Sequence, residues 1–330
     1  MREEVRFLAS LIELYSPTGK VDDAVRFLLD KLEEFELNPR IMDGGAILCE
    51  VGSGGGGILL CGHLDTVPGR LPVKLDDRLI SGRGAVDAKS SLASMIFALK
   101  KLRDFMKIYL LVSVDEEGDS ESTFKAIQTL KGRVKYAIIG EPSRANCITM
   151  AYYGRLAVNL DFKGRKMHPS ACIKMRNVLE ESFKFYLKLK EEVLRTQNPI
   201  SICPIYIHGG GEKFAPDRAR IKLDLRFPPQ VSFEDIRNVI HRVVEENNLE
   251  NPVKCSSSIS HHTPPYQVNL DSPLVKSFIK AIRSKLKIHP KMIRKVGTSD
   301  MNLIGNILSI PAIAYGPGNP RLSHMDVERV

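Results

Sequence analysis

The chain has 330 residues, of which 43% are hydrophobic, 48 are Lys or Arg and 39 are Asp or Glu. This composition excludes a disordered tail and predicts a globular protein of about two domains. No apolar run approaches the roughly 20 residues of a membrane span, and the start lacks a signal-peptide core, so we expect a soluble cytoplasmic protein without a membrane partner. The six cysteines are scattered without a CxxC pair, which favours reduced thiols in the core.

The first half of the chain predicts an α/β arrangement. Apolar residues recur at helical spacing through residues 1–35, where Ser16 to Gly19 separate two helices. Between about 40 and 150, short β-rich runs alternate with helical ones, including a predicted helix at 88–102. The alternation favours a mixed, largely parallel sheet flanked by helices.

Residues 52–57 read Gly-Ser-Gly-Gly-Gly-Gly and formally match the GxGxxG pattern. They precede a predicted strand at 58–61 and do not open a helix, whereas a phosphate cradle needs a helix N-terminus behind it. We therefore interpret this run as a flexible hairpin loop and not as a nucleotide site.

From about residue 151 the pattern changes. It predicts a strand at 156–162, a helix at 177–195, strands at 202–207 and 220–227, a helix at 233–246 and a final strand. This order indicates a small α+β domain over 151–262, inserted into a larger domain formed by 1–150 and 263–330. In the returning segment we expect a helix at 272–284 and a strand at 310–315.

The basic charge is unevenly distributed. Residues 276–295 contain eight basic residues and no acidic one. A solvated helix face explains such a run, and a docking surface for an acidic partner is the alternative. Nucleic-acid binding is not expected, because no basic motif with interleaved aromatics and no recognition-helix signature occurs.

Reactive side chains follow several apolar runs: His63, Asp87, Glu116, Glu117, Glu141 and His324. In an open α/β sheet, residues just beyond the strand ends build the site. Two histidines with three or more carboxylates can hold two divalent ions bridged by one acid. Such ions lower the pKa of a shared water and polarise a carbonyl, so the expected reaction is hydrolysis of an amide or ester.

Glu116 and Glu117 are neighbours, so they point in different directions. One can hold a metal while the other acts as general base. Taken alone, this acidic pair is typical of a solvated loop, and a lone His63 is typical of an interior histidine. Their joint occurrence after successive strands favours a site.

Six motifs resemble, in order, those of the co-catalytic zinc aminoacylases and carboxypeptidases, a family that includes acetylornithine deacetylase and succinyl-diaminopimelate desuccinylase. They are Gly62-His63-Leu64-Asp65-Thr66-Val67-Pro68, Gly82-Arg83-Gly84-Ala85-Val86-Asp87-Ala88-Lys89, Asp115-Glu116-Glu117-Gly118, Gly140-Glu141-Pro142-Ser143, Gly297-Thr298-Ser299-Asp300, and Tyr315-Gly316-Pro317-Gly318 followed by His324.

The resemblance implies a zinc-peptidase-like catalytic domain with two Zn²⁺, for which Co²⁺ can substitute. Asp87 would bridge the ions; His63 and Glu141 would complete one site, and Glu117 and His324 the other. Glu116 would be the general base, and Asp65 would orient His63.

The resemblance also implies that the inserted domain is a lid or dimerisation domain, so we expect a homodimer. His168 would stabilise the tetrahedral oxyanion, often from the partner subunit. Arg226 would bind a substrate carboxylate. Further substrate contacts would come from Thr298, Ser299 and Gly316.

Two features depart from the family pattern. The segment Glu212-Lys213-Phe214-Ala215-Pro216 lacks the asparagine that many relatives carry before this proline, so part of substrate recognition should differ. The chain also stops six residues after His324, where relatives continue into another helix. We expect either a truncated sequence or a fold that closes differently.

The compact length, the segment 297–302 and the basic surface most resemble an archaeal and thermophile branch of this family. That branch releases lysine or ornithine from the C-terminal glutamyl side chain of an acidic amino-group carrier protein, in lysine and arginine biosynthesis. We expect such an amide hydrolase, not an endoprotease. A small-molecule N-acyl amino acid deacylase or a dipeptidase is the alternative. A non-catalytic binding protein is disfavoured, since no expected ligand is lost.

Overall fold

The computed structural model describes residues 2–76, 78–210 and 212–330. Met1, Asp77 and Gly211 lie outside the described residues, and Met1 is the first residue of the segment predicted as helical. The chain divides into two compact units. Unit 1 comprises Met1–Ala151, Gln267–Arg294 and Ser299–Val330, and unit 2 comprises Tyr152–Tyr266 and Lys295–Thr298.

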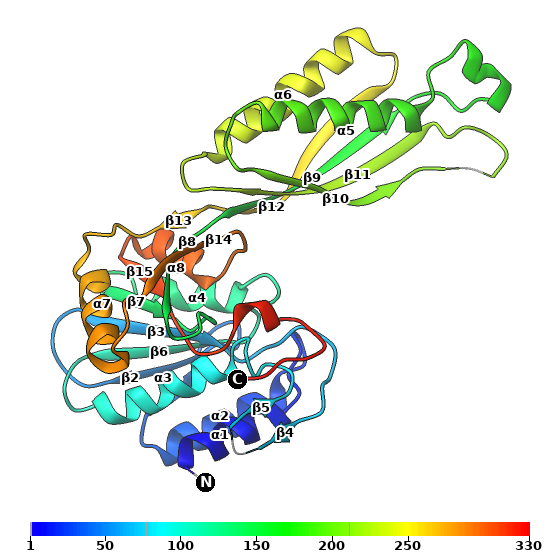
Figure 1. Cartoon of the computed structure of the whole chain (residues 1–330). Coiled ribbons are helices and arrows are strands. Elements are labelled where there is room, and N and C mark those ends of the chain that lie inside the picture. Colours follow the sequence, from blue (N-terminus) through cyan, green and yellow to red (C-terminus); the bar gives the residue numbers. More distant parts are fainter. Residues whose placement is uncertain (1, 77, 211) are drawn as a thin grey trace. The chain divides into compact units, whose positions relative to one another are not determined.

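Unit 1 is built on a mixed sheet with the strand order β1-β2-β6-β3-β7-β15-β8-β13 (Figure 1). The central strands β6 (Ile108–Ser113), β3 (Gly57–His63), β7 (Val134–Ile139) and β15 (Ala312–Ala314) are parallel. The flanking strands are β1 (Arg40–Ile41), β2 (Ile47–Val51), β8 (Cys147–Tyr152), β13 (Tyr266–Gln267) and β14 (Lys291–Lys295), which pairs with β8. The predicted fold class, a largely parallel sheet flanked by helices, is confirmed.

Helices cover both faces of this sheet (Figure 1). On one face α3 (Lys89–Leu102) packs on β3 and β6, and α1 (Glu3–Glu13) with α2 (Asp22–Glu34) forms an outer layer. On the other face α4 (Glu121–Gln128) and α8 (Asp300–Leu308) pack together, while α7 (Pro273–Leu286) precedes β14. The helices predicted from apolar periodicity are confirmed within a few residues. In each helix the recurring apolar residues, such as Leu11 in α1, Leu28 in α2 and Leu92 in α3, lie on the face that becomes buried.

The loop at residues 52–57 is not the hairpin that the sequence suggested. Strand β6 lies between β2 and β3, antiparallel to β2 and parallel to β3, so the loop connects two strands that are not neighbours. Gly52 has φ +70°, and a Cβ there would lie 2.0 Å from the carbonyl oxygen of Met106. The glycine therefore serves a close backbone crossing.

Unit 2 is an antiparallel sheet with two helices on one face (Figure 1). Its strands, in the order β10-β11-β9-β12, are β10 (Ser201–His208), β11 (Arg218–Phe227), β9 (Gly154–Lys163) and β12 (Lys254–Thr263). The helices are α5 (Val178–Leu194) and α6 (Phe233–Glu250), with a short 3₁₀ helix, η1, at Pro169–Ile173. Along β11, buried Ile221 and Leu223 alternate with exposed Arg220 and Lys222, so the face without helices is polar.

All six cysteines lie among the described residues and are free thiols. Cys49, Cys61 and Cys255 are buried as expected, and Cys147 and Cys172 are partly buried. Cys203 is exposed, because it alternates with buried Ile202 on β10 and lies on the opposite face of the sheet. The expectation that the cysteines are core residues is therefore wrong for Cys203. Among the described residues, no helix has both the length and the apolar character that crossing a membrane requires.

Candidate metal centre

The parallel strands of unit 1 deliver reactive side chains to one edge of the sheet. His63 is the last residue of β3 and is in register with Ser113, the last residue of β6. Glu116 and Glu117 follow β6, and Glu141 follows β7. Because parallel strands end at the same edge, these side chains come from separate parts of the sequence to one place.

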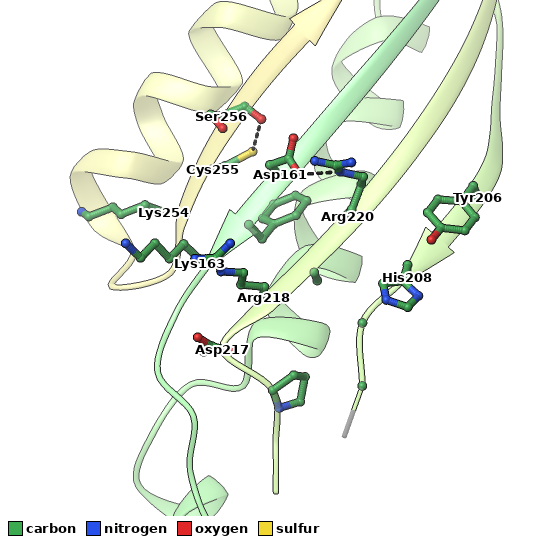
Figure 2. Close-up of a pocket in the computed structure, with 15 residues that line it drawn as sticks. Asp161, Lys163, Tyr206, His208, Asp217, Arg218, Arg220, Lys254, Cys255 and Ser256 are labelled. Atoms are coloured by element: carbon green, nitrogen blue, oxygen red, sulfur yellow. Dashed lines mark hydrogen bonds and ion pairs between the residues drawn. The ribbon is translucent and has the colours of Figure 1, made fainter. Parts of the chain in front are cut away.

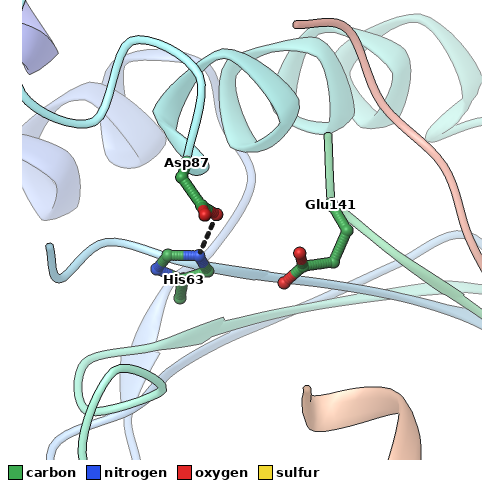
Figure 3. A group of neighbouring side chains, drawn as sticks. All are labelled: His63, Asp87 and Glu141. Carbon is green, nitrogen blue, oxygen red and sulfur yellow. Dashed lines mark ion pairs between the residues drawn. The ribbon is translucent and has the colours of Figure 1, made fainter. Parts of the chain in front are cut away.

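The Asp87 carboxylate lies between two imidazoles. Its Oδ1 is 3.4 Å from Nε2 of His63, and its Oδ2 is 3.3 Å from Nε2 of His324. His324 Nε2 is also 2.8 Å from Oε1 of Glu117. On the other side, Figure 3 shows Glu141 pointing toward His63 and Asp87. Each oxygen of the Asp87 carboxylate thus lies near a different histidine.

Three groups of possible ligand atoms lie within 4.8 Å of one another. They are His63, Asp87 and Glu141; His63, Glu116 and Glu117; and Asp87, Glu117 and His324. The first and third groups share only Asp87. Neutral imidazole and carboxylate donors without a thiolate suit zinc and related divalent ions.

The ring of His63 is oriented so that a metal ion can bind Nε2 once that atom has lost its proton. Its Nδ1 is 2.9 Å from the carbonyl oxygen of Asp65, which can only accept a hydrogen bond, so Nδ1 carries the proton. Nε2 is buried, and although Oδ1 of Asp87 lies 3.4 Å away, Nε2 makes no hydrogen bond of good geometry among the described residues. A buried donor atom without a partner is costly in a protein but fits a metal ligand.

Asp65 supports not only His63 but also the turn that contains Glu116 and Glu117. Its carboxylate accepts hydrogen bonds from the backbone N–H groups of Glu116 and Glu117, both at 3.1 Å, and from Oγ1 of Thr18 at 2.7 Å. The same carboxylate is 3.5 Å from Nδ1 of His63. Asp65 therefore fixes the turn that carries both glutamates. Thr18 was not predicted from the sequence, where its only signal is a turn between two helices.

Lys89 anchors the helix that follows Asp87. It is fully buried, and its Nζ donates to the carbonyl oxygens of Leu11 at 2.9 Å and Leu14 at 2.6 Å, at the end of α1. Burial lowers the pKa of Lys89 to about 7. The start of α3 is thus tied to α1 by a side chain that also satisfies two helix-terminal carbonyls.

The charges of the centre are strongly coupled. Burial opposes ionisation of Asp87, yet His324 and His63 keep the pKa of this carboxyl below its ordinary value. Asp87 and Glu117 raise the pKa of His324 to about 10. Burial disfavours the charged form of His63, but Asp65 and Asp87 still raise its pKa well above the usual range. The imidazole of His324 is therefore protonated at neutral pH in the metal-free chain, and the carboxylates around His63 favour its protonated form as well.

Glu116 differs from the other carboxylates. Burial raises its pKa well above the ordinary range, and the negative charges of Glu141 and Asp300 add to this effect. Asp300 is itself buried beneath the centre, where its carboxylate accepts a hydrogen bond from Thr123 at 2.9 Å and burial raises its pKa to about 6. A carboxyl group with a raised pKa is suited to taking and returning a proton near neutral pH.

Two predicted substrate-binding residues lie in unit 1. Ser299 caps α8, since its hydroxyl accepts the N–H of Met301 at 3.2 Å. Gly316 exchanges hydrogen bonds with Ser143, and a Cβ at this position would lie 2.1 Å from the hydroxyl of Ser91. Both residues therefore have structural roles, a helix cap for Ser299 and a close backbone contact for Gly316, that were not predicted from the sequence.

The remaining predicted residues, His168, Arg226 and Thr298, lie in unit 2. His168 is exposed at the start of η1, with its Nδ1 2.9 Å from the hydroxyl of Ser170. Arg226 donates from Nε to Asp224 at 2.6 Å, and Asp224 also accepts from Arg155 at 2.7 Å. The guanidinium is thereby held in a fixed orientation.

Unit 2 also carries an open cavity of about 790 Å³ on the sheet face without helices (Figure 2). Basic side chains, including Lys163, Arg218 and Lys254, line it, and Arg220 pairs with Asp161 at 2.6 Å. We call this the basic cavity. None of the histidines and carboxylates of the metal-ligand groups is among its lining residues.

Comparison with known proteins relates the chain to hydrolases. A model of peptidase family M20/M25/M40 matches residues 59–330. A putative LysW-lysine/LysW-ornithine hydrolase of Thermococcus kodakarensis is 34% identical over 99% of this chain and 87% of its own length. A LysW-lysine/LysW-ornithine hydrolase of Sulfurisphaera tokodaii is 31% identical over 100% of this chain and 90% of its own.

Solved structures show the same fold at lower identity. An M20 family metallo-carboxypeptidase of Sulfolobus solfataricus superposes with a TM-score of 0.80 at 18% identity, covering 100% of this chain and 95% of that one. A tripeptidase of Staphylococcus aureus gives a TM-score of 0.83 at 17% identity, covering 99% and 92%.

Binding of Zn²⁺ to the metal-free protein at pH 7 is expected to release protons, because the pKa of His324 is raised to about 10, the carboxylates around His63 favour its protonated form, and only neutral imidazole binds a metal. Calorimetric titration in two buffers of different ionisation enthalpy measures this release. His324→Gln should release about one proton fewer per chain. Equal release by both proteins would contradict the assigned protonation of His324.

Proposed function

Because the chain belongs to peptidase family M20/M25/M40, we propose that it is a hydrolase that cleaves an amide bond with two divalent metal ions. The observation that carries this proposal is the Asp87 carboxylate, which offers one oxygen toward His63 and the other toward His324. Asp87 would bridge two Zn²⁺, or two Co²⁺ in their place. His63 and Glu141 would complete one site, and Glu117 and His324 the other.

When bound, the ions would polarise the scissile carbonyl and lower the pKa of a water molecule. Glu116 would accept a proton from that water and return it to the leaving amine nitrogen, a role supported by its raised pKa. Asp65 would keep Glu116 and Glu117 apart in their separate roles, because it holds both of their backbone N–H groups.

Glu116→Gln should lower kcat by about 10² to 10⁴ fold, since the amide cannot accept the proton. Zn²⁺ content should stay near that of the wild type. Asp87→Asn is the matched comparison and should lose both turnover and bound Zn²⁺. The measurements are steady-state rates together with metal content after dialysis. A fully active Glu116→Gln protein would show that another group is the base.

For the substrate, we propose an acidic amino-group carrier protein that holds lysine, ornithine or both on its C-terminal glutamyl side chain. Relatives spanning nearly the whole chain carry the name LysW-lysine/LysW-ornithine hydrolase. The reaction would release the amino acid in lysine or arginine biosynthesis. Arg226, oriented by Asp224, would bind a substrate carboxylate, and Thr298, Ser299 and Gly316 would make further substrate contacts.

Charge supports a carrier partner. The basic strip, which we define as the basic residues of 276–295 on α7 and β14, includes exposed Lys280, Arg283 and Lys291. Long-range attraction to an acidic protein raises the association rate and is weakened by salt. The basic cavity of unit 2 is a second cationic surface. Substitutions there can therefore serve as a control for substitutions in the basic strip.

The double variant Lys280→Glu/Arg283→Glu should raise KM about tenfold for the carrier conjugate at low salt and leave an acetylated free amino acid unaffected. Arg218→Glu/Lys254→Glu, in the basic cavity, is the control with the same change of charge. Arg226→Ala should raise KM for both kinds of substrate. The variants are compared by rates at low and moderate salt.

The result also separates the two substrate classes. Carrier turnover that falls only with the basic-cavity variant would move the docking surface to unit 2. Rapid hydrolysis of the free substrate, with none of the carrier conjugate, would assign the protein to the small-molecule deacylases or dipeptidases.

We also propose a homodimer formed through unit 2. Phe183 and Leu187 are 50% and 60% exposed on α5, and Ile205 is 61% exposed on the edge strand β10. Exposed apolar groups beside an unpaired strand edge are typical of an interface. His168 would then stabilise the oxyanion in the partner subunit's site.

Mixing two inactive variants, His168→Ala and Glu116→Gln, should restore part of the activity, because one mixed-dimer site then has both groups. Adding Phe183→Glu/Leu187→Glu to both chains should give monomers by analytical ultracentrifugation and abolish the recovery. Leu249→Glu, at an exposed apolar position on α6, is the matched control. Mixed dimers without recovered activity would exclude the action of His168 across subunits.

A further inference from the structure

A buried carboxylate near the end of the chain holds the backbone that carries Asp87. Glu328 is 1% exposed. Its Oε1 accepts hydrogen bonds from the N–H groups of Val86 at 3.0 Å and Asp87 at 2.9 Å, and its Oε2 is 3.1 Å from Nη1 of Arg83. One side chain therefore binds three donors of the loop between β5 (Ile80–Ser81) and α3.

The backbone of the same C-terminal segment also pairs with β5. Ile80 and Val330 exchange two hydrogen bonds of 2.9 Å, and the carbonyl of Glu328 accepts the N–H of Gly82 at 3.1 Å. Arg83 donates in addition to the carbonyl of Met325 at 3.2 Å. The segment is thus fixed to the Asp87 loop by backbone and side chain together.

His324 lies on this segment, four residues before Glu328. It has φ +63°, in the left-handed region that non-glycine residues rarely adopt. Such a conformation persists only where the flanking chain is held. On one side is the 3₁₀ helix η2 (Pro320–Leu322), and on the other is Glu328.

A buried ion pair adds little to the free energy of unfolding, because the cost of desolvation offsets most of the gain from pairing. It fixes local geometry well, since a carboxylate accepts several short, directional hydrogen bonds. Here those bonds connect the two chain segments whose side chains, Asp87 and His324, meet at 3.3 Å.

We propose that Glu328 is a positioning residue that sets Asp87 and His324 at the separation needed to bind the second metal ion. The inference rests on the proposed function, in which Asp87, Glu117 and His324 hold that ion. Glu328 would act through the Asp87 backbone and through the conformation of His324, without touching metal or substrate.

The test measures Zn²⁺ binding to the metal-free protein by competition with a chelating indicator, with no substrate present. Glu328→Ala should weaken the second equivalent of Zn²⁺ by about ten- to a hundredfold, as loss of groups that support metal ligands usually does. Glu328→Gln should be intermediate, because its amide oxygen can still accept the N–H groups of Val86 and Asp87. At saturating Zn²⁺, kcat should follow the same order while KM changes little.

Arg329→Ala, at an exposed position on the same segment, is the control and should bind both equivalents as the wild type does. A purely structural role would lower the thermal midpoint of the Glu328 variants without weakening Zn²⁺, and that result would overturn the proposal. If Glu328→Ala does not fold, unchanged Zn²⁺ affinity in Glu328→Gln overturns it equally. A wild-type chain that binds no Zn²⁺ would instead refute the proposed function, and this inference with it, whereas failure on carrier substrates leaves the Zn²⁺ result intact.

Discussion

The arrangement around Asp87 depends on one electrostatic constraint, a largely buried carboxylate shared by two imidazoles. Its two oxygens are 3.4 Å and 3.3 Å from the ring nitrogens of His63 and His324. Without cationic or metallic partners, a carboxylate in this position would lose its charge. The surrounding structure supplies the geometry. Asp65 holds the turn with Glu116 and Glu117, Lys89 anchors the helix that follows Asp87, and Glu328 binds the loop before it.

The fold alone does not identify the substrate. Solved structures with TM-scores of 0.80 and 0.83 share only 18% and 17% identity with this chain, and they include a carboxypeptidase and a tripeptidase. A common fold thus accommodates several amide substrates. If the proposed function holds, residues around the centre and charged surfaces such as the basic strip would select among them.

The sequence predicted those parts of the fold that depend on local periodicity. The helices α1, α2, α3 and α5 were recognisable because their apolar residues repeat every three or four positions. Strand order was not accessible in this way. The loop at 52–57 was interpreted as a hairpin because it precedes a predicted strand and does not open a helix, whereas the placement of β6 between β2 and β3 depends on tertiary contacts.

The same distinction applies to the candidate centre. Residues with reactive side chains, such as His63 and Asp87, could be selected by type and by their occurrence after apolar runs. The hydrogen bonds that hold these residues could not be predicted, because almost every residue has a backbone N–H group and the sequence does not show which of them a side chain will contact. Asp65 was expected to serve His63, yet its carboxylate mainly accepts from Glu116, Glu117 and Thr18. Glu328 was not among the residues predicted from the sequence, because its type and position do not reveal its three donors.

The two histidines differ in exposure: His63 is 2% exposed and the side chain of His324 is 50% exposed. With two ions bound as proposed, the ion at His324 would be the more accessible to solvent and to small chelators. A chelator added to the loaded protein would therefore reach the outer ion before the inner one.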